Sequence, residues 1–193
     1  DIEKAIHYYS LAASQNNPEA LFNLGEIYYT GKYILKDIEK AIHYFTLSAD
    51  QDEPSALYQI AYIYRIGDYV TQDINKSIKY YLRAAEQDNP EALFDLGVIY
   101  ETGKYVKRDI KTAIHYYERA ADQDKQEARY NLGLLYLEDL KDVNKAFYYF
   151  KYLAELGYPQ AQYQMGEIYS NGIYITRDIY QAIHYYSLAS DQQ

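Results

Sequence analysis

Histidine is the side chain most often used as a metal ligand or general base near neutral pH, and this chain repeats it inside one short segment. The segment reads AIHYY at residues 5–9, 113–117 and 182–186 and AIHYF at residues 41–45. It carries His7, His43, His115 and His184. On a helix with 100° per residue, His43 lies about 200° from Ala41, on the side opposite the apolar face. We therefore expect the histidines on a solvated helix face.

The same register gives a second reason to reject a histidine site. Two further copies of the segment carry Lys79 and Tyr148 at the histidine position, and a lysine ammonium group has no acceptor to offer a metal. Zinc needs its ligands about 2 Å from one ion, whereas packed helices lie about 8–10 Å apart. Only His7 and His43 lie in adjacent copies, and no third ligand converges on them. The sequence predicts no metal site.

Paired carboxylates are the other candidates for chemistry, because they could act as acid and base or bind calcium. Asp50 with Asp52 and Asp122 with Asp124 are such pairs, but they fall where helices are expected to end, and aspartate is common in exposed turns. The sequence contains no twelve-residue calcium loop, phosphate-binding glycine loop or nucleophile elbow. We therefore predict no catalytic residue, no cofactor and no enzymatic activity.

Composition limits the classes of partner. The 193 residues include 28 acidic and 19 basic side chains, for a net charge of −9, which disfavours nucleic acid and anionic membrane surfaces. No apolar run approaches the ~20 residues of a membrane span, so we expect no membrane insertion. The chain has no cysteine, which fits a cytoplasmic location, with a lumenal or secreted location as the alternative.

A period of mostly 36 residues organises the chain. The segment that contains the histidines begins with Asp-Ile at residues 1, 37, 73, 109 and 178, and a variant begins at residue 142. The period divides the chain into five repeats, at residues 18–53, 54–89, 90–125, 126–158 and 159–193. Residues 1–17 precede them and correspond to the second half of a repeat, a single helix. The array is expected to be part of a longer one, because it starts with half a repeat.

Each repeat reads as two helices, which we call helix A and helix B. In the first full repeat, helix A is expected from Pro18 to about Thr30, with Gly31 just past its end. Helix B is expected to follow Asp37 as its N-cap residue. Each helix B is expected to end in a left-handed residue, because Asn, Asp and Gly tolerate positive φ. These residues are Asn16, Asp52, Asp88, Asp124 and Gly157.

The repeated pattern resembles the Sel-1-like repeat, a relative of the tetratricopeptide repeat with a longer loop. In the first full repeat it reads Ala20, Leu24, Gly25, Tyr28, Gly31, Ile34, Asp37, Lys40, Ala41, Tyr44, Phe45, Ser48 and Ala49. The usual second loop glycine is Tyr33, Tyr69, Tyr105 or Tyr174 here, and the fourth repeat has a loop three residues shorter. The resemblance implies an all-α fold, a right-handed α-solenoid of antiparallel helix pairs with about 5.5 repeats.

The resemblance also places the outer side of helix A on a concave surface. Three rows of residues occupy that side, one residue from each repeat. The first row is Phe22, Tyr58, Phe94, Tyr130 and Tyr163. The second row is Glu26, Tyr62, Val98, Leu134 and Glu167, and the third row is Tyr29, Arg65, Glu101, Leu137 and Ser170. The second and third rows differ in chemistry from repeat to repeat, which indicates recognition of a non-repeating partner. Alternatively, the aromatic row packs against neighbouring A helices and is partly buried.

We therefore predict a non-enzymatic scaffold or adaptor that binds a peptide or protein domain along the three rows. Repeat 18–53 has seven acidic and three basic side chains, so a basic segment of the partner is expected there. The alternative is a structural spacer or regulatory array attached to another domain, catalytic or not, of a longer protein. Self-association through the exposed terminal helices is also expected.

Overall fold

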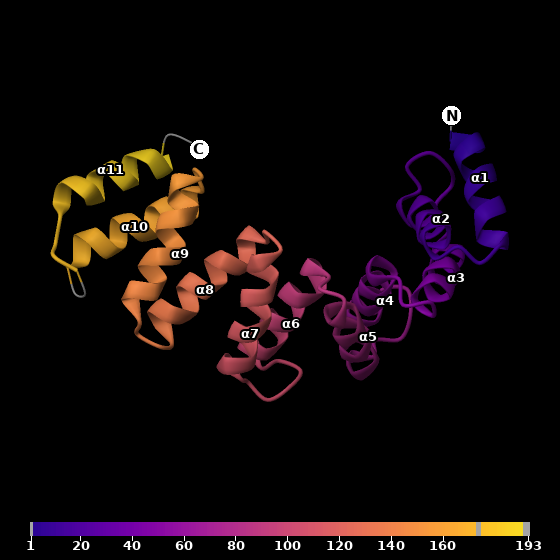
Figure 1. Ribbon diagram of the computed structural model, residues 1–193, viewed down its shortest axis with the longest axis horizontal. Helices are drawn as coiled ribbons and strands as arrows, with labels where there is room; N and C mark the ends of the chain where they lie inside the picture. Colours follow the sequence, from indigo (N-terminus) through magenta and orange to yellow (C-terminus); the bar gives the residue numbers. More distant parts are fainter. Residues whose placement is uncertain (1, 173–174, 191–193) are drawn as a thin grey trace. The chain divides into compact units, whose positions relative to one another are not determined.

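The computed structural model describes residues 2–172 and 175–190, and its regular structure there is entirely α-helical (Figure 1). The B helices are α1 (Ile2–Ser14), α3 (Ile38–Ala49), α5 (Ile74–Glu86), α7 (Ile110–Asp122), α9 (Val143–Glu155) and α11 (Ile179–Ser190). The A helices are α2 (Pro18–Thr30), α4 (Pro54–Ile66), α6 (Pro90–Thr102), α8 (Gln126–Glu138) and α10 (Pro159–Asn171). The expected helix pairs are therefore present.

Local sequence signals begin and end these helices. The Asp37 side chain accepts a hydrogen bond from the backbone N–H of Lys40 at 3.0 Å, and this bond holds the pKa of Asp37 below its usual range. At the other end of α2, Gly31 is left-handed with φ of 62°, and a Cβ there would lie 2.6 Å from the Cβ of Lys36. Glycine is therefore required by conformation and by space.

The turns from helix B to the next helix A also follow the sequence. Asn16, Asp52, Asp88, Asp124 and Gly157 all have positive φ, between 54° and 86°, as predicted. The sequence did not predict the positive φ of 56° at Lys141. Lys141 lies in the short loop between α8 and α9, which lacks the glycine of the other repeats.

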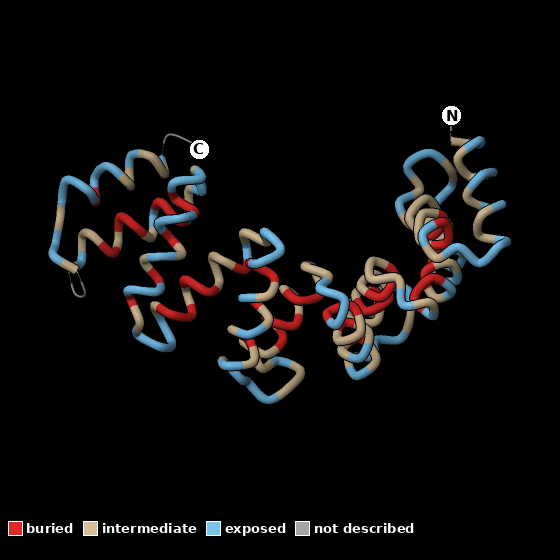
Figure 2. Tube along the Cα trace, viewed as in Figure 1, coloured by how far each residue is buried: buried red, intermediate tan, exposed pale blue. Residues whose placement is uncertain are grey.

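The chain forms two compact units, residues 1–96 and residues 97–193. In the first unit, helix A packs on helix B within each repeat, and helix B packs on the next helix A. Leu24, Phe45, Leu57 and Tyr81 are among its fully buried side chains. Figure 2 shows this core as a line of buried helix segments between exposed loops.

The second unit repeats the same packing scheme among α7 to α11. Tyr117, Leu132, Phe150 and Leu153 are fully buried there. Close approach of the two helices depends on a small residue in helix A, as the sequence indicated. A Cβ at Gly133 would lie 2.6 Å from the Phe150 ring. Gly25, Gly97 and Gly166 face the equivalent ring in the same way, and the second full repeat has Ala61 at this position.

Stacked tyrosines join helix A to helix B in every full repeat and explain part of the high tyrosine content. The pairs are Tyr28–Tyr44, Tyr64–Tyr80, Tyr100–Tyr116, Tyr136–Tyr149 and Tyr169–Tyr185. Their ring centroids lie 5.8–6.3 Å apart. Offset stacking of this kind stabilises a pair by about 0.5–1.5 kcal/mol beyond burial. The sequence located these rings near the core but did not pair them.

Candidate functional site

The structure places the three predicted rows on the accessible side of the A helices. Tyr163 is 51% exposed, and the other fourteen row residues are half-buried. The histidines and their replacements, Lys79 and Tyr148, are exposed on the B helices, in agreement with the expected solvated face. The row residues are therefore accessible in part, and the two sets lie on different helices.

The first row packs against the aromatic ring of helix B in the same repeat. The ring centroids of Phe22 and Phe45 lie 5.7 Å apart, and those of Tyr58 and Tyr81 lie 5.8 Å apart. Tyr130 with Phe150 and Tyr163 with Tyr186 make the same contact at 5.6 Å. The row is thus partly buried, as the alternative interpretation held. The burying partner is a helix-B ring of the same repeat.

In the first unit, a tyrosine hydroxyl reaches from the core to the third row. The Tyr81 hydroxyl donates to the Asp95 carboxylate at 2.7 Å and accepts from Nε of Arg65 at 3.1 Å. Nη2 of Arg65 also lies 3.7 Å from the Asp95 carboxylate. Burial raises the pKa of Tyr58 to about 12, with a further contribution from the negative charge of Asp95. Arg65 is therefore held by internal partners.

The second unit contains two related networks. The Tyr117 hydroxyl donates to the Glu101 carboxylate and accepts from the Asn131 amide at 3.0 Å. The Tyr186 hydroxyl donates to the Glu167 carboxylate. Burial raises the pKa of Tyr186, and the hydrogen bond to Glu167 raises it further. Glu101 and Glu167 therefore satisfy tyrosine hydroxyls that would otherwise lose hydrogen bonds to water.

These networks give a second reason for the variation in the third row. Where helix B has tyrosine, at positions 81, 117 and 186, the third-row residue is Arg65, Glu101 or Ser170, which is polar. Where helix B has phenylalanine, at positions 45 and 150, the third-row residue is Tyr29 or Leu137. A buried hydroxyl needs a polar partner and a phenyl ring does not. Part of the variation assigned to recognition is therefore explained by internal packing.

Two more row residues in the first unit are engaged by their neighbours. The Glu26 carboxylate accepts a hydrogen bond from the Gln59 amide at 3.0 Å, while burial raises the pKa of Glu26. Tyr29 meets the loop residue Tyr69 at a ring-centroid distance of 6.4 Å. The Lys36 ammonium lies 5.3 Å and 5.4 Å from the Tyr29 and Tyr69 ring centroids. The loop tyrosine in place of the usual glycine thus covers one end of the third row.

A cavity of about 480 Å³ lies in the second unit beside the first row. It is lined by Tyr130, Pro159, Gln160, Tyr163, Tyr186, Ala189 and Ser190. The sequence predicted two of these, Tyr130 and Tyr163. The sequence did not predict Pro159 and Tyr186 as binding residues, because equivalent residues recur in other repeats and such recurrence indicates a packing role. The contribution of α11 to the lining became visible only with the fold.

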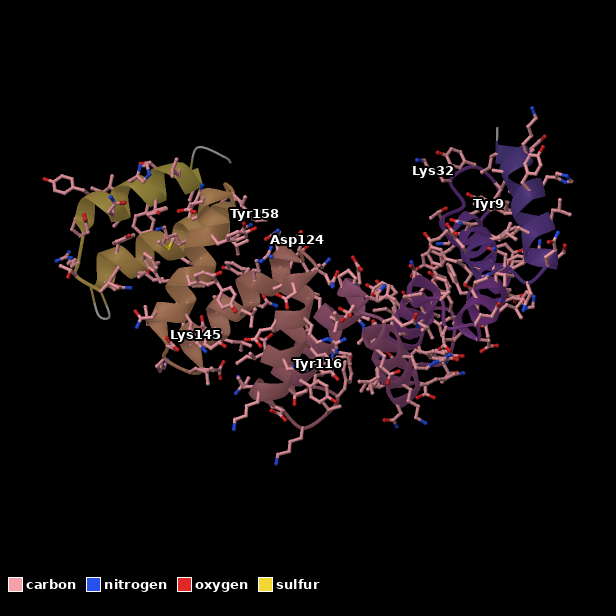
Figure 3. All side chains as sticks on the ribbon, in the orientation of Figure 1. Tyr9, Lys32, Tyr116, Asp124, Lys145 and Tyr158 are labelled. Atoms are coloured by element: carbon pink, nitrogen blue, oxygen red, sulfur yellow. The ribbon has the colours of Figure 1, made fainter. Side chains whose placement is uncertain are left out.

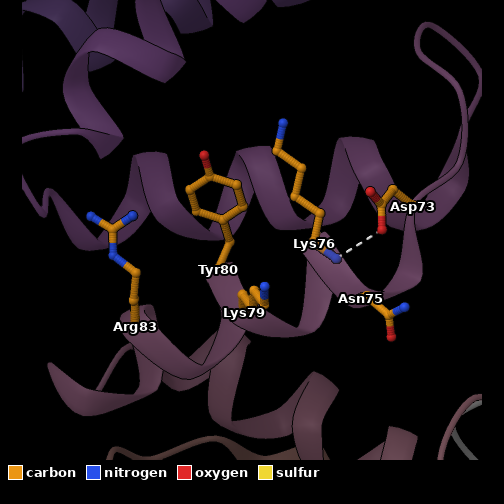
Figure 4. A pocket seen from close by; sticks show the side chains of 6 residues that line it. All are labelled: Asp73, Asn75, Lys76, Lys79, Tyr80 and Arg83. Atoms are coloured by element: carbon orange, nitrogen blue, oxygen red, sulfur yellow. Dashed lines mark hydrogen bonds between the residues drawn. The ribbon is translucent and has the colours of Figure 1, made fainter.

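A second cavity, of about 550 Å³, lies along the outer face of α5 (Figure 4). Asp73, Asn75, Lys76, Lys79, Tyr80 and Arg83 line it. The Lys76 ammonium donates to the Tyr64 hydroxyl at 2.6 Å, and the Arg83 guanidinium lies 2.7 Å from the Asp52 carboxylate. The sequence did not single out this basic surface. Two of its three cations already serve contacts between helices.

Within the described part of the chain, no group of three or more His, Asp or Glu side chains is arranged to hold a metal ion. None of the described helices combines the length and apolar character needed to cross a bilayer.

Stacked helix pairs with accessible A-helix rows define an α-solenoid of the tetratricopeptide-like class. The chain belongs to the Sel1 repeat family, which matches residues 1–17, 18–53, 54–89, 90–125, 126–158 and 159–193. Proteins built from Sel1 repeats are generally non-catalytic scaffolds that mediate protein interactions. No curated protein matches the chain significantly.

Solved structures share the fold over nearly the whole chain. A Sel1 repeat protein from Oxalobacter formigenes is 31% identical, with 100% of this chain and 80% of that chain covered and a TM-score of 0.83. A protective antigen of uropathogenic Escherichia coli strains with an SLR fold is 27% identical, with a TM-score of 0.90. The match covers 97% of this chain and 41% of that antigen, so this chain spans less than half of it. An immunity protein from Pseudomonas aeruginosa is 26% identical, with a TM-score of 0.58 over 96% of this chain and 72% of that one.

Proposed function

We propose that the protein is a scaffold that binds a peptide or protein domain on the A-helix rows. The observation that carries the proposal is the apolar cavity beside Tyr130 and Tyr163 in the second unit. Tyr163 stands at its edge with half of its surface exposed. Exposed aromatic side chains beside an apolar cavity are typical of protein-binding surfaces, because they supply contact area at low entropic cost.

Preordered side chains support this role. Tyr163 is held by the Tyr186 ring, and in the first unit Tyr58 is held by Tyr81. A side chain that is fixed before binding loses little conformational entropy on binding, so more of the contact energy becomes affinity. Arg65, Glu101, Glu167 and Ser170 contact the tyrosine hydroxyls, so we assign these polar row residues mainly to this preordering. Apolar and aromatic row residues would make the direct contacts.

Peptide selection tests the proposal without a known partner. A phage-displayed random peptide library would be selected on the immobilised protein, and an enriched peptide would be titrated by calorimetry. We expect Tyr163→Ala to weaken binding at least tenfold, because truncation of an anchoring aromatic typically costs about 2 kcal/mol or more. Tyr163 is half exposed, so this variant should fold, which circular dichroism would check.

Tyr180→Ala is the matched control, because Tyr180 is 88% exposed on α11 and does not line the cavity. It should bind the peptide as the parent protein does. If the enriched peptides bind Tyr163→Ala and Tyr58→Ala with unchanged affinity, the A-helix rows are not the binding surface. Failure to enrich any peptide would favour the spacer function.

A further inference from the structure

A small cavity of about 190 Å³ lies in the second unit among α7, α8 and α9. It is lined by Glu118, Ala121, Asp122, Arg129, Tyr148, Tyr149 and Tyr152. Three tyrosines and two carboxylates therefore surround one space. This cavity is separate from the rows on the A helices, because six of its seven lining residues come from α7 and α9, which are B helices.

The composition of this cavity is not repeated along the chain. Other B helices carry histidine or lysine in the register of Tyr148, and leucine or arginine in the register of Tyr152. The Glu118 register has serine, threonine, leucine or lysine elsewhere. Arg129 stands where the first three full repeats bury Leu21, Leu57 and Leu93. An open polar cavity thus replaces a packed leucine at this junction.

The charge inside the cavity is negative. Arg129 is turned toward the loop before α8, where its guanidinium lies 3.2 Å from the Asp124 carboxylate and 2.9 Å from the Gln126 side-chain oxygen. Asp124 is labelled in Figure 3. Asp124 neutralises Arg129, so the negative charges of Glu118 and Asp122 are not balanced within the lining. The Glu118 carboxylate also accepts a hydrogen bond from the Tyr136 hydroxyl at 3.4 Å. Burial raises the pKa of Tyr149 to about 12, and the charges of Glu118 and Asp122 contribute to this rise.

The aromatic rings around the cavity already attract the protein's own cations. The Arg129 guanidinium lies 4.8 Å from the Tyr152 ring centroid. The Lys145 ammonium lies 4.6 Å from the ring centroid of Tyr136, which stacks on Tyr149. Lysine–tyrosine contacts recur in the first unit, at 5.1 Å for Lys40 with Tyr28 and 4.1 Å for Lys76 with Tyr64. Cations are drawn to the negative faces of such rings.

We propose that this cavity binds the ammonium group of a lysine side chain presented by a partner protein. The Glu118 and Asp122 carboxylates accept its hydrogen bonds, and Tyr148 and Tyr149 contact its methylene stem. A compact ammonium with three donors suits acceptors spread around a small cavity, whereas a planar guanidinium suits two acceptors in one plane. The negative charge of the cavity selects the charged side chain, and the tyrosine rings supply faces for the cation and its methylene stem.

Nuclear magnetic resonance with a defined probe tests the assignment. The peptide acetyl-Gly-Gly-Lys-Gly-Gly-amide would be titrated into protein labelled on its tyrosine rings, with Tyr148, Tyr149 and Tyr152 as reporters. We expect saturable shifts of these three rings, with a Kd on the order of millimolar for one side chain. The same peptide with acetylated lysine lacks the charge and should leave the rings unshifted.

Charge-neutral variants of exposed residues supply the decisive comparison. Glu118→Gln combined with Asp122→Asn should weaken lysine-peptide binding at least fivefold, and Tyr148→Ala should also weaken it. Glu138→Gln and Tyr180→Ala, at exposed positions away from the cavity, should bind as the parent does. Equal binding of the acetylated peptide, or unchanged binding by the double variant, would overturn the proposal. Tighter binding of a trimethyl-lysine peptide would overturn the role of hydrogen bonds to an ammonium.

Discussion

The tyrosine hydroxyls of the B helices determine much of what stands opposite them on the A helices. Tyr81 and Tyr117 are fully buried as rings, but their hydroxyls meet Asp95 and Glu101. A hydroxyl in an apolar site without a partner costs about 1–3 kcal/mol. A buried helix-B tyrosine therefore requires a polar side chain opposite its hydroxyl on helix A, so the identity of one residue constrains that of another.

A pair of substitutions in the fourth repeat tests this pairing. Phe150→Tyr should lower the free energy of unfolding by about 1–3 kcal/mol, because its hydroxyl would face Leu137 by register. Adding Leu137→Glu reproduces the Tyr117–Glu101 pair and should restore part of that loss. Chemical denaturation followed by circular dichroism would measure all four proteins of the cycle. The pairing would be refuted if the two substitutions were additive, since coupled neighbours differ from additivity by about 0.5–3 kcal/mol.

At the scale of the element, residues with positive φ end the turns between helices. Gly31 ends α2 with positive φ and leaves no space for a Cβ beside Lys36. Gly157 ends the turn after α9 with φ of 86°, and its added Cβ would meet no atom within 4 Å. The two glycines share a conformation and differ in their surroundings.

This difference predicts unequal costs for the same substitution. Gly157→Ala should lower the free energy of unfolding by about 1 kcal/mol, the cost of a left-handed alanine. Gly31→Ala should cost more, because the new methyl group also collides with Lys36. Thermal and urea unfolding of the two variants would measure the costs side by side. Equal losses would show that the loop between α2 and α3 moves to accept the methyl group.

At the scale of the molecule, tyrosine dominates the packing: the chain has 28 tyrosines, five phenylalanines and no tryptophan. Burial raises the pKa of Tyr58 in the first unit and of Tyr149 in the second to about 12. An unfolded tyrosine ionises near pH 10. Between these values the unfolded chain loses protons that the folded chain keeps, so stability falls as pH rises.

Alkaline unfolding should therefore begin above pH 10. We expect the urea midpoint to be stable below pH 10 and to fall as pH approaches about 12, while tyrosinate absorbance rises together with unfolding. Tyr58→Phe should reduce the fall, because one raised pKa is removed. A urea midpoint that stays constant through this range would contradict the prediction.

The sequence by itself determined the repeats, the helix ends and the solvated histidine face, because these depend on local spacing. The helix ends depend on residues such as Pro18, Gly31 and Asp37, which act on backbone groups only a few positions away. Their effects can therefore be predicted without knowing the tertiary structure. Helical periodicity put the three rows on the side of helix A away from the core, and the resemblance to Sel-1-like repeats predicted that this side lines a concave surface. Binding at those rows stays a prediction.

Only the tertiary structure decided which side chains meet across helices. Gln59 donates a hydrogen bond to Glu26, and Arg65 and Asp95 both contact the Tyr81 hydroxyl. Periodicity predicts the helix face on which each residue lies but not its partner on another helix. In the cavity around Tyr148, the Arg129 guanidinium pairs with Asp124, and no repeat pattern predicts that contact. The rotamer and the hydrogen-bond partner of a side chain depend on neighbours that are distant in sequence. The positions of those neighbours are known only once the helices are packed.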